Sequence, residues 1–126
     1  MTILGIDFGL KKIGLAMAED GFVSPLRVIA NSSQTLEQIT ILCKERSVQK
    51  IILGRSDNKL FPFAESFARI LEERCHLPVE FQDETLTTND AIERMITLGK
   101  KRKFRQEQED AVSAALILEE YLAKNA

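Results

Sequence analysis

The sequence predicts an α/β protein with a mixed five-stranded sheet covered by helices on both faces. Residues 2–29 contain three short apolar runs joined by turn residues, which is typical of an antiparallel meander. Two further apolar runs, at 50–54 and 78–82, each follow a segment with helical spacing. Such alternation requires crossover connections, so these two strands should run parallel to a neighbour. The expected order of elements is βββαβαβαα.

The first three strands are expected at residues 2–9, 13–18 and 22–29. Lys11 and Lys12 then fall near the first hairpin turn. Pro25 cannot donate a backbone hydrogen bond, so the third strand should lie at a sheet edge or begin after the proline. The run at 50–54 is continuously apolar, which favours an interior strand.

Four helices are expected from apolar spacing and end signals. The first covers about 35–46 and starts with Thr-Leu-Glu-Gln, which resembles a capping box. The second covers about 62–76, with its proline in the first turn. The third covers about 87–99 and stops at a glycine. The last runs over about 107–123, and the basic residues before it are expected to form a loop.

Length and composition indicate one domain, residues 1–126, of globular type, with 44% hydrophobic and 29% charged residues. No apolar run is long enough for a membrane span, and the chain enters a strand directly, without the pattern of a secretory signal. We therefore expect a cytoplasmic protein with no membrane partner, as a monomer or weak homodimer.

Cys43 and Cys75 are expected as reduced thiols, and the single histidine, His76, has no second ligand nearby for zinc.

Three carboxylates are candidates for one site. Asp7 follows the first apolar strand, Glu84 follows the fifth, and Asp110 lies in the first turn of the last helix. In an open α/β sheet, ligands bind beyond the carboxyl ends of strands, so the fold could bring these groups together. Each also has a simpler interpretation: a turn-capping aspartate, a solvated strand-end glutamate, and an aspartate that complements a helix N-terminus.

Three ionised carboxylates within a few ångströms repel one another unless their pKa values rise or a cation neutralises them. Magnesium prefers oxygen ligands and keeps several waters, which suits carboxylates beside a substrate phosphate. Divalent ions held in this way can activate a water for attack on a phosphodiester and stabilise the leaving oxygen. The chain offers no credible histidine base or cysteine nucleophile as an alternative.

The net charge is −2, but positive charge is concentrated near residue 100. We expect these residues and the hairpin lysines to attract a phosphate backbone, although the block could also be an ordinary solvated loop. The candidate nucleic-acid-binding residues are Lys11, Lys12, Lys100, Lys101, Arg102, Lys103 and Arg105.

Three motifs in register resemble those of the YqgF family, also called RuvX, whose members are described as pre-16S rRNA nucleases and Holliday junction resolvase-like proteins. The opening motif is ILGIDFG at 3–9 with KIGLA at 12–16. The second, DETLTT at 83–88, is similar to the family pattern Asp-Glu-Arg-(Leu/Phe)-(Ser/Thr)-Thr, and the third is EDAVSAALIL at 109–118. Leu10 and Thr85 depart from the usual threonine and arginine, and the loop after residue 54 is short.

The resemblance implies a ribonuclease H-like fold and a magnesium-dependent nuclease, with manganese as a substitute ion. By matching position, Asp7, Glu84 and Asp110 would be the metal-binding catalytic residues. It also implies cytoplasmic maturation of the 5′ end of pre-16S rRNA, so pre-rRNA is favoured over branched DNA as the partner.

Three other functions remain open from the sequence. The first is Holliday junction resolution on branched DNA. The second is a non-catalytic RNA-binding factor in ribosome assembly, which Thr85 would favour. The third is nucleotide binding, because Gly5 to Gly9 also resembles the phosphate loop of actin-like ATPases. Those ATPases need a second domain to enclose the nucleotide.

Overall fold

The computed structural model describes residues 1–55, 59–83 and 102–125. The described strands form one five-stranded sheet in the order β3-β2-β1-β4-β5. β1 pairs antiparallel with β2, and β2 with β3, while β4 and β5 run parallel to β1. The predicted meander, the interior fourth strand and the two parallel strands are therefore confirmed. The strands are β1 (Thr2–Phe8), β2 (Lys12–Glu19), β3 (Phe22–Ala30), β4 (Lys50–Arg55) and β5 (Val79–Asp83).

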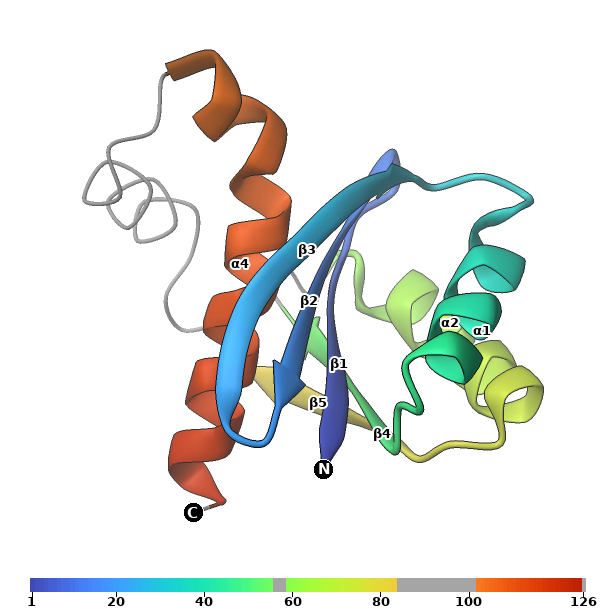
Figure 1. Ribbon diagram of the computed structural model, residues 1–126. Helices are drawn as coiled ribbons and strands as arrows, with labels where there is room; N and C mark the ends of the chain where they lie inside the picture. Colours follow the sequence, from blue (N-terminus) through green and yellow to red (C-terminus); the bar gives the residue numbers. More distant parts are fainter. Residues whose placement is uncertain (56–58, 84–101, 126) are drawn as a thin grey trace.

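The described helices cover both faces of this sheet, as Figure 1 shows, with two helices on one face and the longest on the other. None of them is long and apolar enough to cross a membrane. The predicted third helix, at 87–99, lies outside the described residues. The described helices are α1 (Thr35–Glu45), α2 (Phe61–Cys75) and α4 (Arg102–Lys124).

The side chains of β1 alternate between two hydrophobic cores. Leu4 and Ile6 join the core under α1 and α2. Ile3 joins the second core, beneath α4, and Gly5 also faces α4, where it packs on Leu118. Successive side chains of a strand point to opposite faces. The next residue of the second set is Asp7, so its side chain is directed to the α4 side of the sheet.

Pro25 lies inside β3, and β3 is an edge strand, as predicted. The β2–β3 register shifts between Leu15 and Ala16, which pair with Arg27 and Pro25 respectively. The extra residue between these partners is Leu26. A bulge at this point accommodates the proline, which has no N–H for the ladder.

The predicted start of the last helix was wrong. α4 begins at Arg102, not near Glu107, so Arg102, Lys103 and Arg105 belong to its first turns and not to a loop. Arginine, lysine, glutamine and glutamate are strong helix formers, so a helix can begin among them without apolar periodicity. The prediction used the apolar pattern, which begins later in the sequence.

The predicted capping box at α1 was also wrong. The N-cap residue is Gln34, and it makes no side-chain capping hydrogen bond. Thr35 is instead buried in the first turn, where its hydroxyl donates to the Ala30 carbonyl at 2.9 Å and accepts from the Ser32 N–H at 2.8 Å. These bonds join the start of α1 to the end of β3.

Two glycines let α4 approach the sheet closely. A Cβ atom added to Gly5 would lie 2.5 Å from Leu118 Cγ. One added to Gly14 would overlap the backbone carbonyl of Asp110. Both positions face α4, so the helix backbone at Asp110 rests directly on β2 at Gly14.

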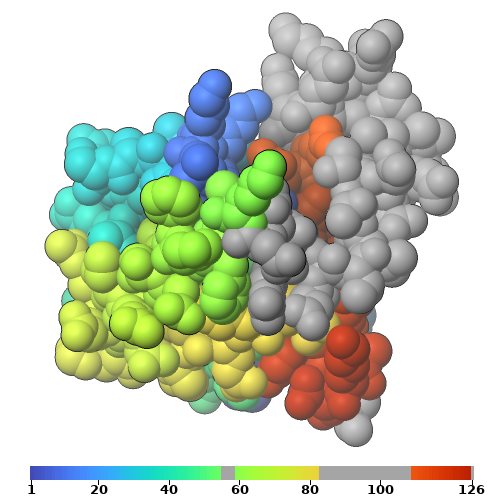
Figure 2. Space-filling model, turned by 180° about the vertical axis from the view of Figure 1, so that it is seen from behind, coloured from blue at the N-terminus to red at the C-terminus, as the bar shows by residue number. Residues whose placement is uncertain are grey.

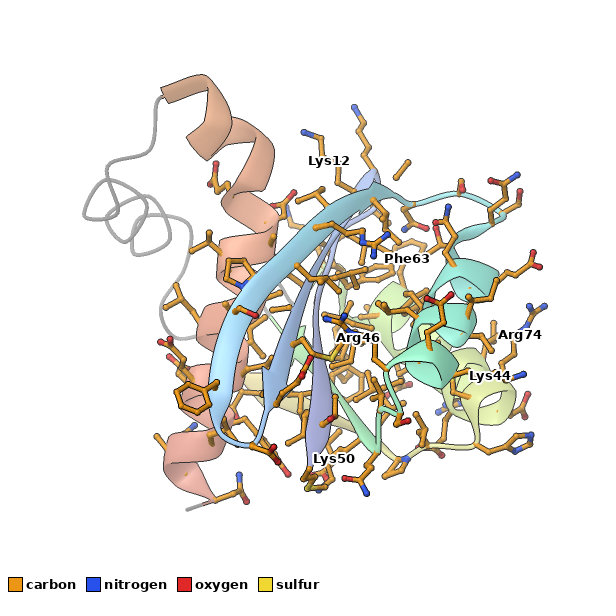
Figure 3. The ribbon with its side chains drawn as sticks, in the orientation of Figure 1. Lys12, Lys44, Arg46, Lys50, Phe63 and Arg74 are labelled. Carbon is orange, nitrogen blue, oxygen red and sulfur yellow. The ribbon has the colours of Figure 1, made fainter. Side chains whose placement is uncertain are left out.

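The far end of α4 is held by polar contacts. Lys50 Nζ donates to the Tyr121 hydroxyl at 2.9 Å and forms an ion pair with Glu80 at 2.7 Å. Its ammonium also lies 5.5 Å from the centre of the Tyr121 ring. Lys50 and Lys12 lie at opposite ends of the sheet, as Figure 3 shows. α4 is therefore fixed to the sheet at two points, Asp110 and Tyr121.

Both cysteines are free thiols, as predicted. Cys43 is buried at the α1–α2 contact, close to the Cys75 thiol, and Cys75 Sγ lies 3.6 Å from Thr40 Oγ1. Burial, together with the neighbouring Cys75 thiol, raises the pKa of the Cys43 thiol from 9.0 to about 12.

We predict that Gly14→Ala lowers the free energy of unfolding by about 1–3 kcal/mol, because the new methyl group must displace the Asp110 turn of α4. Urea denaturation monitored by circular dichroism measures this change. Ser24→Ala, on the exposed part of β3, is the control and should change stability little. Equal stability of Gly14→Ala and the wild type would contradict the close approach.

We also predict that Cys43 makes stability fall with pH above 9.0. The unfolded thiol loses its proton near pH 9.0, whereas the folded thiol keeps it up to about 12. The unfolded state then binds fewer protons, so the contribution is complete below 9.0 and is lost as pH rises through this interval. Urea unfolding at neutral pH and between these two values should show a smaller pH-dependent loss in Cys43→Ala than in wild type. Identical losses in the two proteins would contradict the shift.

Candidate functional site

A cavity of about 320 Å³ lies at the edge of the sheet where β1 ends. Figure 2 shows the molecule from behind. Blue residues from near the N-terminus lie there beside the orange residues of α4. The cavity brings together two acidic and two basic side chains from positions far apart in the sequence. It is lined by Asp7, Phe8, Gly9, Lys11, Lys12 and Asp110.

Asp7 is positioned by the backbone of three strands. It pairs with Gly14 of β2 on one side and with Gly54 of β4 on the other. Neither glycine has a side chain to crowd the carboxylate, which is half-buried. The alternation along β1 directs Asp7 toward α4.

Asp110 reaches the same place from the other end of the chain. Its carbonyl lies against Gly14, which is the residue directly opposite Asp7 in the β1–β2 ladder. Paired residues of an antiparallel ladder have Cα atoms about 4.5–5.5 Å apart. Asp110 is half-buried and lines the cavity together with Asp7. The fold therefore brings Asp7 and Asp110, which are 110 − 7 = 103 positions apart in the sequence, to the lining of one cavity.

Glu84, the third predicted carboxylate, lies outside the described residues. The backbone of β5 ends at Asp83, which pairs with Arg55, and Arg55 directly follows Gly54, the partner of Asp7. β5 therefore ends at the same end of the sheet as β1, two strands away. At about 4.8 Å per strand, that is a separation of about 10 Å between backbones.

The donors at this cavity suit a hard divalent cation. Asp7 and Asp110 offer carboxylate oxygens, which magnesium and manganese prefer, and none of the described lining residues carries sulfur or imidazole. Within the ranges that the structure describes, no cluster of three or more histidine, cysteine, aspartate or glutamate residues is found. His76 caps the far end of α2 and is exposed, so it is not part of this site.

Lys11 and Lys12 provide the positive charge at the cavity. Both are exposed on the turn between β1 and β2, and Figure 3 shows Lys12 at this end of the sheet. The start of α4 lies at the same end, so Arg102, Lys103 and Arg105 are carried there by the helix backbone, as Figure 1 shows. The side chains of these three residues, and Lys100 and Lys101 entirely, lie outside the described part of the chain.

Two residues that the sequence did not single out also shape the site. Gly14 lets the Asp110 backbone approach β2 beside Asp7, and its position opposite Asp7 in the predicted hairpin could have revealed it. Asn31 donates from Nδ2 to the Gly9 carbonyl at 2.8 Å. No local pattern marks Asn31, because this contact joins residues 22 positions apart.

The fold is shared with solved resolvases. The chain superposes on Thermus thermophilus RuvC, solved in complex with a Holliday junction substrate, with a TM-score of 0.61 over 98% of this chain and 96% of that one. For the fowlpox virus resolvase, solved with Holliday junction DNA, the TM-score is 0.66 over 98% of both chains. Sequence identities are 15% and 12%, so these likenesses show the ribonuclease H-like fold alone.

Curated relatives are closer in sequence. A protein of Listeria monocytogenes serotype 4b, named "Putative pre-16S rRNA nuclease", is 34% identical over 97% of both chains. A protein of Syntrophomonas wolfei with the same name is 33% identical over 97% of this chain and 94% of its own. The family model described as "RuvX: Holliday junction resolvase" matches residues 1–124. The chain therefore belongs to the RuvX family.

Proposed function

We propose that this protein is a magnesium-dependent nuclease that hydrolyses phosphodiester bonds, and that its substrate is the 5′ region of pre-16S rRNA. The observation that supports it most is the convergence of Asp7 and Asp110 on one cavity beside Lys11 and Lys12. Oxygen ligands for a cation and positive charge for phosphate are thus placed together. Glu84 is proposed as the third carboxylate, because it follows β5, which ends at the same end of the sheet as β1.

In this proposal Asp7, Asp110 and Glu84 would hold Mg²⁺, with Mn²⁺ as a substitute. A bound divalent ion supplies Lewis acidity, which lowers the pKa of water and stabilises charge on phosphate oxygens. The carboxylates of Asp7 and Asp110 gather negative charge at one cavity, which a divalent cation would neutralise. Lys11 and Lys12 attract the phosphate backbone and orient it over the cavity.

The basic residues near the start of α4 extend this surface in the proposal. Arg102, Lys103 and Arg105 belong to the helix turns that precede Asp110, and Lys100 and Lys101 come before them in the sequence. A nucleic acid that spans from these residues to Lys11 and Lys12 would pass over the carboxylates. Binding should then fall steeply with salt, as expected for phosphate contacts.

Pre-rRNA is proposed as the substrate because the curated relatives, similar over nearly their whole length, carry names for a pre-16S rRNA nuclease. Cytoplasmic action follows from that substrate. Branched DNA is the second candidate. The description of the family model as a Holliday junction resolvase favours it, and the solved resolvases share the fold.

We predict that Asp7→Asn and Asp110→Asn each lower magnesium-dependent cleavage about 100-fold or more, because several kcal/mol of transition-state stabilisation depend on the ion. The substrates are an end-labelled RNA that contains the 5′ boundary of the small-subunit rRNA and a four-way DNA junction. Cleavage should require Mg²⁺ or Mn²⁺ and stop when EDTA is added. Both variants should keep the far-ultraviolet circular dichroism spectrum of the wild type, so that lost cleavage does not report lost folding.

Asp20→Asn is the matched control, since Asp20 is an exposed aspartate in the β2–β3 hairpin whose carboxylate pairs with the N-terminal ammonium at 2.9 Å. It should cleave at the wild-type rate. Preferential cleavage of the junction would favour the DNA alternative. Magnesium-dependent cleavage that survives in Asp7→Asn would remove Asp7 from the mechanism, and salt-sensitive binding without cleavage would leave an RNA-binding factor.

A further inference from the structure

The turn between β1 and β2 carries the lysines of the proposed nuclease site, and it is held by a residue from another part of the chain. Asn31 follows β3 and makes two hydrogen bonds to this turn. Its side-chain Nδ2 donates to the Gly9 carbonyl at 2.8 Å, and its backbone N–H donates to the Lys11 carbonyl at 2.9 Å. Gly9 and Lys11 therefore both have their carbonyl groups fixed by Asn31.

These bonds act on a tight turn. A Cβ atom added to Gly9 would lie 2.6 Å from the Lys12 carbonyl, so the two ends of the turn are in close contact. Phe8 and Ile13 form the last pair of the β1–β2 ladder, and beyond it the ladder gives the turn no support. The direction in which Lys11 and Lys12 leave the turn thus depends on contacts from outside it.

Asn31 is itself held firmly. The residue before it, Ala30, pairs with Lys12 at the end of the β2–β3 ladder. The Ala30 carbonyl accepts a hydrogen bond from the buried Thr35 hydroxyl, which also accepts from the Ser32 N–H. Hydrogen bonds from the first turn of α1 therefore hold the residues on both sides of Asn31, and Asn31 bonds to the turn that lines the cavity.

We infer that Asn31 is a positioning residue for substrate binding: its amide holds the Gly9–Lys12 turn so that Lys11 and Lys12 contact phosphate beside Asp7 and Asp110. This inference rests on the proposed nuclease function. Only the amide nitrogen can serve here, because the partner is a carbonyl oxygen, which accepts hydrogen bonds and does not donate them. Asn31 touches neither the cavity nor the substrate in this role.

The test is a double-mutant cycle on nucleic-acid binding, in the full chain carrying Asp7→Asn so that cleavage does not interfere. Fluorescence anisotropy measures the affinity for a labelled single-stranded RNA at several salt concentrations. Asn31→Ala is combined with the pair Lys11→Ala/Lys12→Ala. Ser33→Ala is the control, because Ser33 is exposed on the same β3–α1 connection.

Asn31→Ala should weaken binding about 3- to 10-fold, the range expected for one lost hydrogen bond, while Ser33→Ala should not. In the chain that lacks both lysines, Asn31→Ala should have almost no further effect, because interacting residues are not additive. In Asn31→Ala, the slope of log affinity against log salt should also become less steep. The expected change is about 0.7 for each phosphate contact with a single strand that is lost. A residue that only stabilised the fold would weaken both chains equally, and that result would overturn the inference.

Hydrogen–deuterium exchange distinguishes a failure of this inference from a failure of the proposed function. Asn31→Ala should speed exchange across residues 8–13, with no nucleic acid present. If exchange rises but no variant binds RNA or DNA, the nuclease proposal fails and the role of Asn31 in binding fails with it. If wild type binds and exchange does not change, Asn31 does not hold the turn and the inference alone is wrong.

Discussion

The candidate site depends on one close contact, between the backbone of α4 at Asp110 and the bare Cα of Gly14. A side chain at residue 14 would lift the helix from the sheet at the position opposite Asp7. Gly5 and Leu118 make a similar contact two turns further along the helix, and Tyr121 with Lys50 holds the far end. The helix is therefore fixed in register, and a residue from the end of the chain faces one from its beginning.

This contact has an electrostatic cost. Two carboxylates that share a cavity repel each other, and a protein that gains nothing from them would be expected to replace one. The lysines on the neighbouring turn offset the charge in part, but both are exposed and lie well placed to interact with an approaching anion. The same arrangement of carboxylate oxygens and lysines can accept a divalent cation and a phosphate together, which connects the packing of α4 with the proposed chemistry.

The sequence predicted the parts of this structure that depend on local patterns. Short apolar runs separated by turns located the strands, and the position of Asp7 at the end of the first run marked the site. The start of α4 was missed because the sequence from Arg102 to Arg105 is mostly basic and shows no apolar periodicity. Thr35 was assigned to a cap because its hydroxyl partner, Ala30, became apparent only in three dimensions. Asn31 was missed for the same reason, since its partners lie across the sheet edge.

The most direct test of the central claim is a crystal soaked with manganese, whose anomalous scattering locates the ion without reference to activity. We predict a peak at about 2.2 Å from carboxylate oxygens of both Asp7 and Asp110, with Glu84 as a further ligand, and no such peak in Gly14→Ala or Asp7→Asn crystals. Manganese bound elsewhere, or at one carboxylate without the other, would contradict the claim that the packing of α4 on Gly14 builds a metal site.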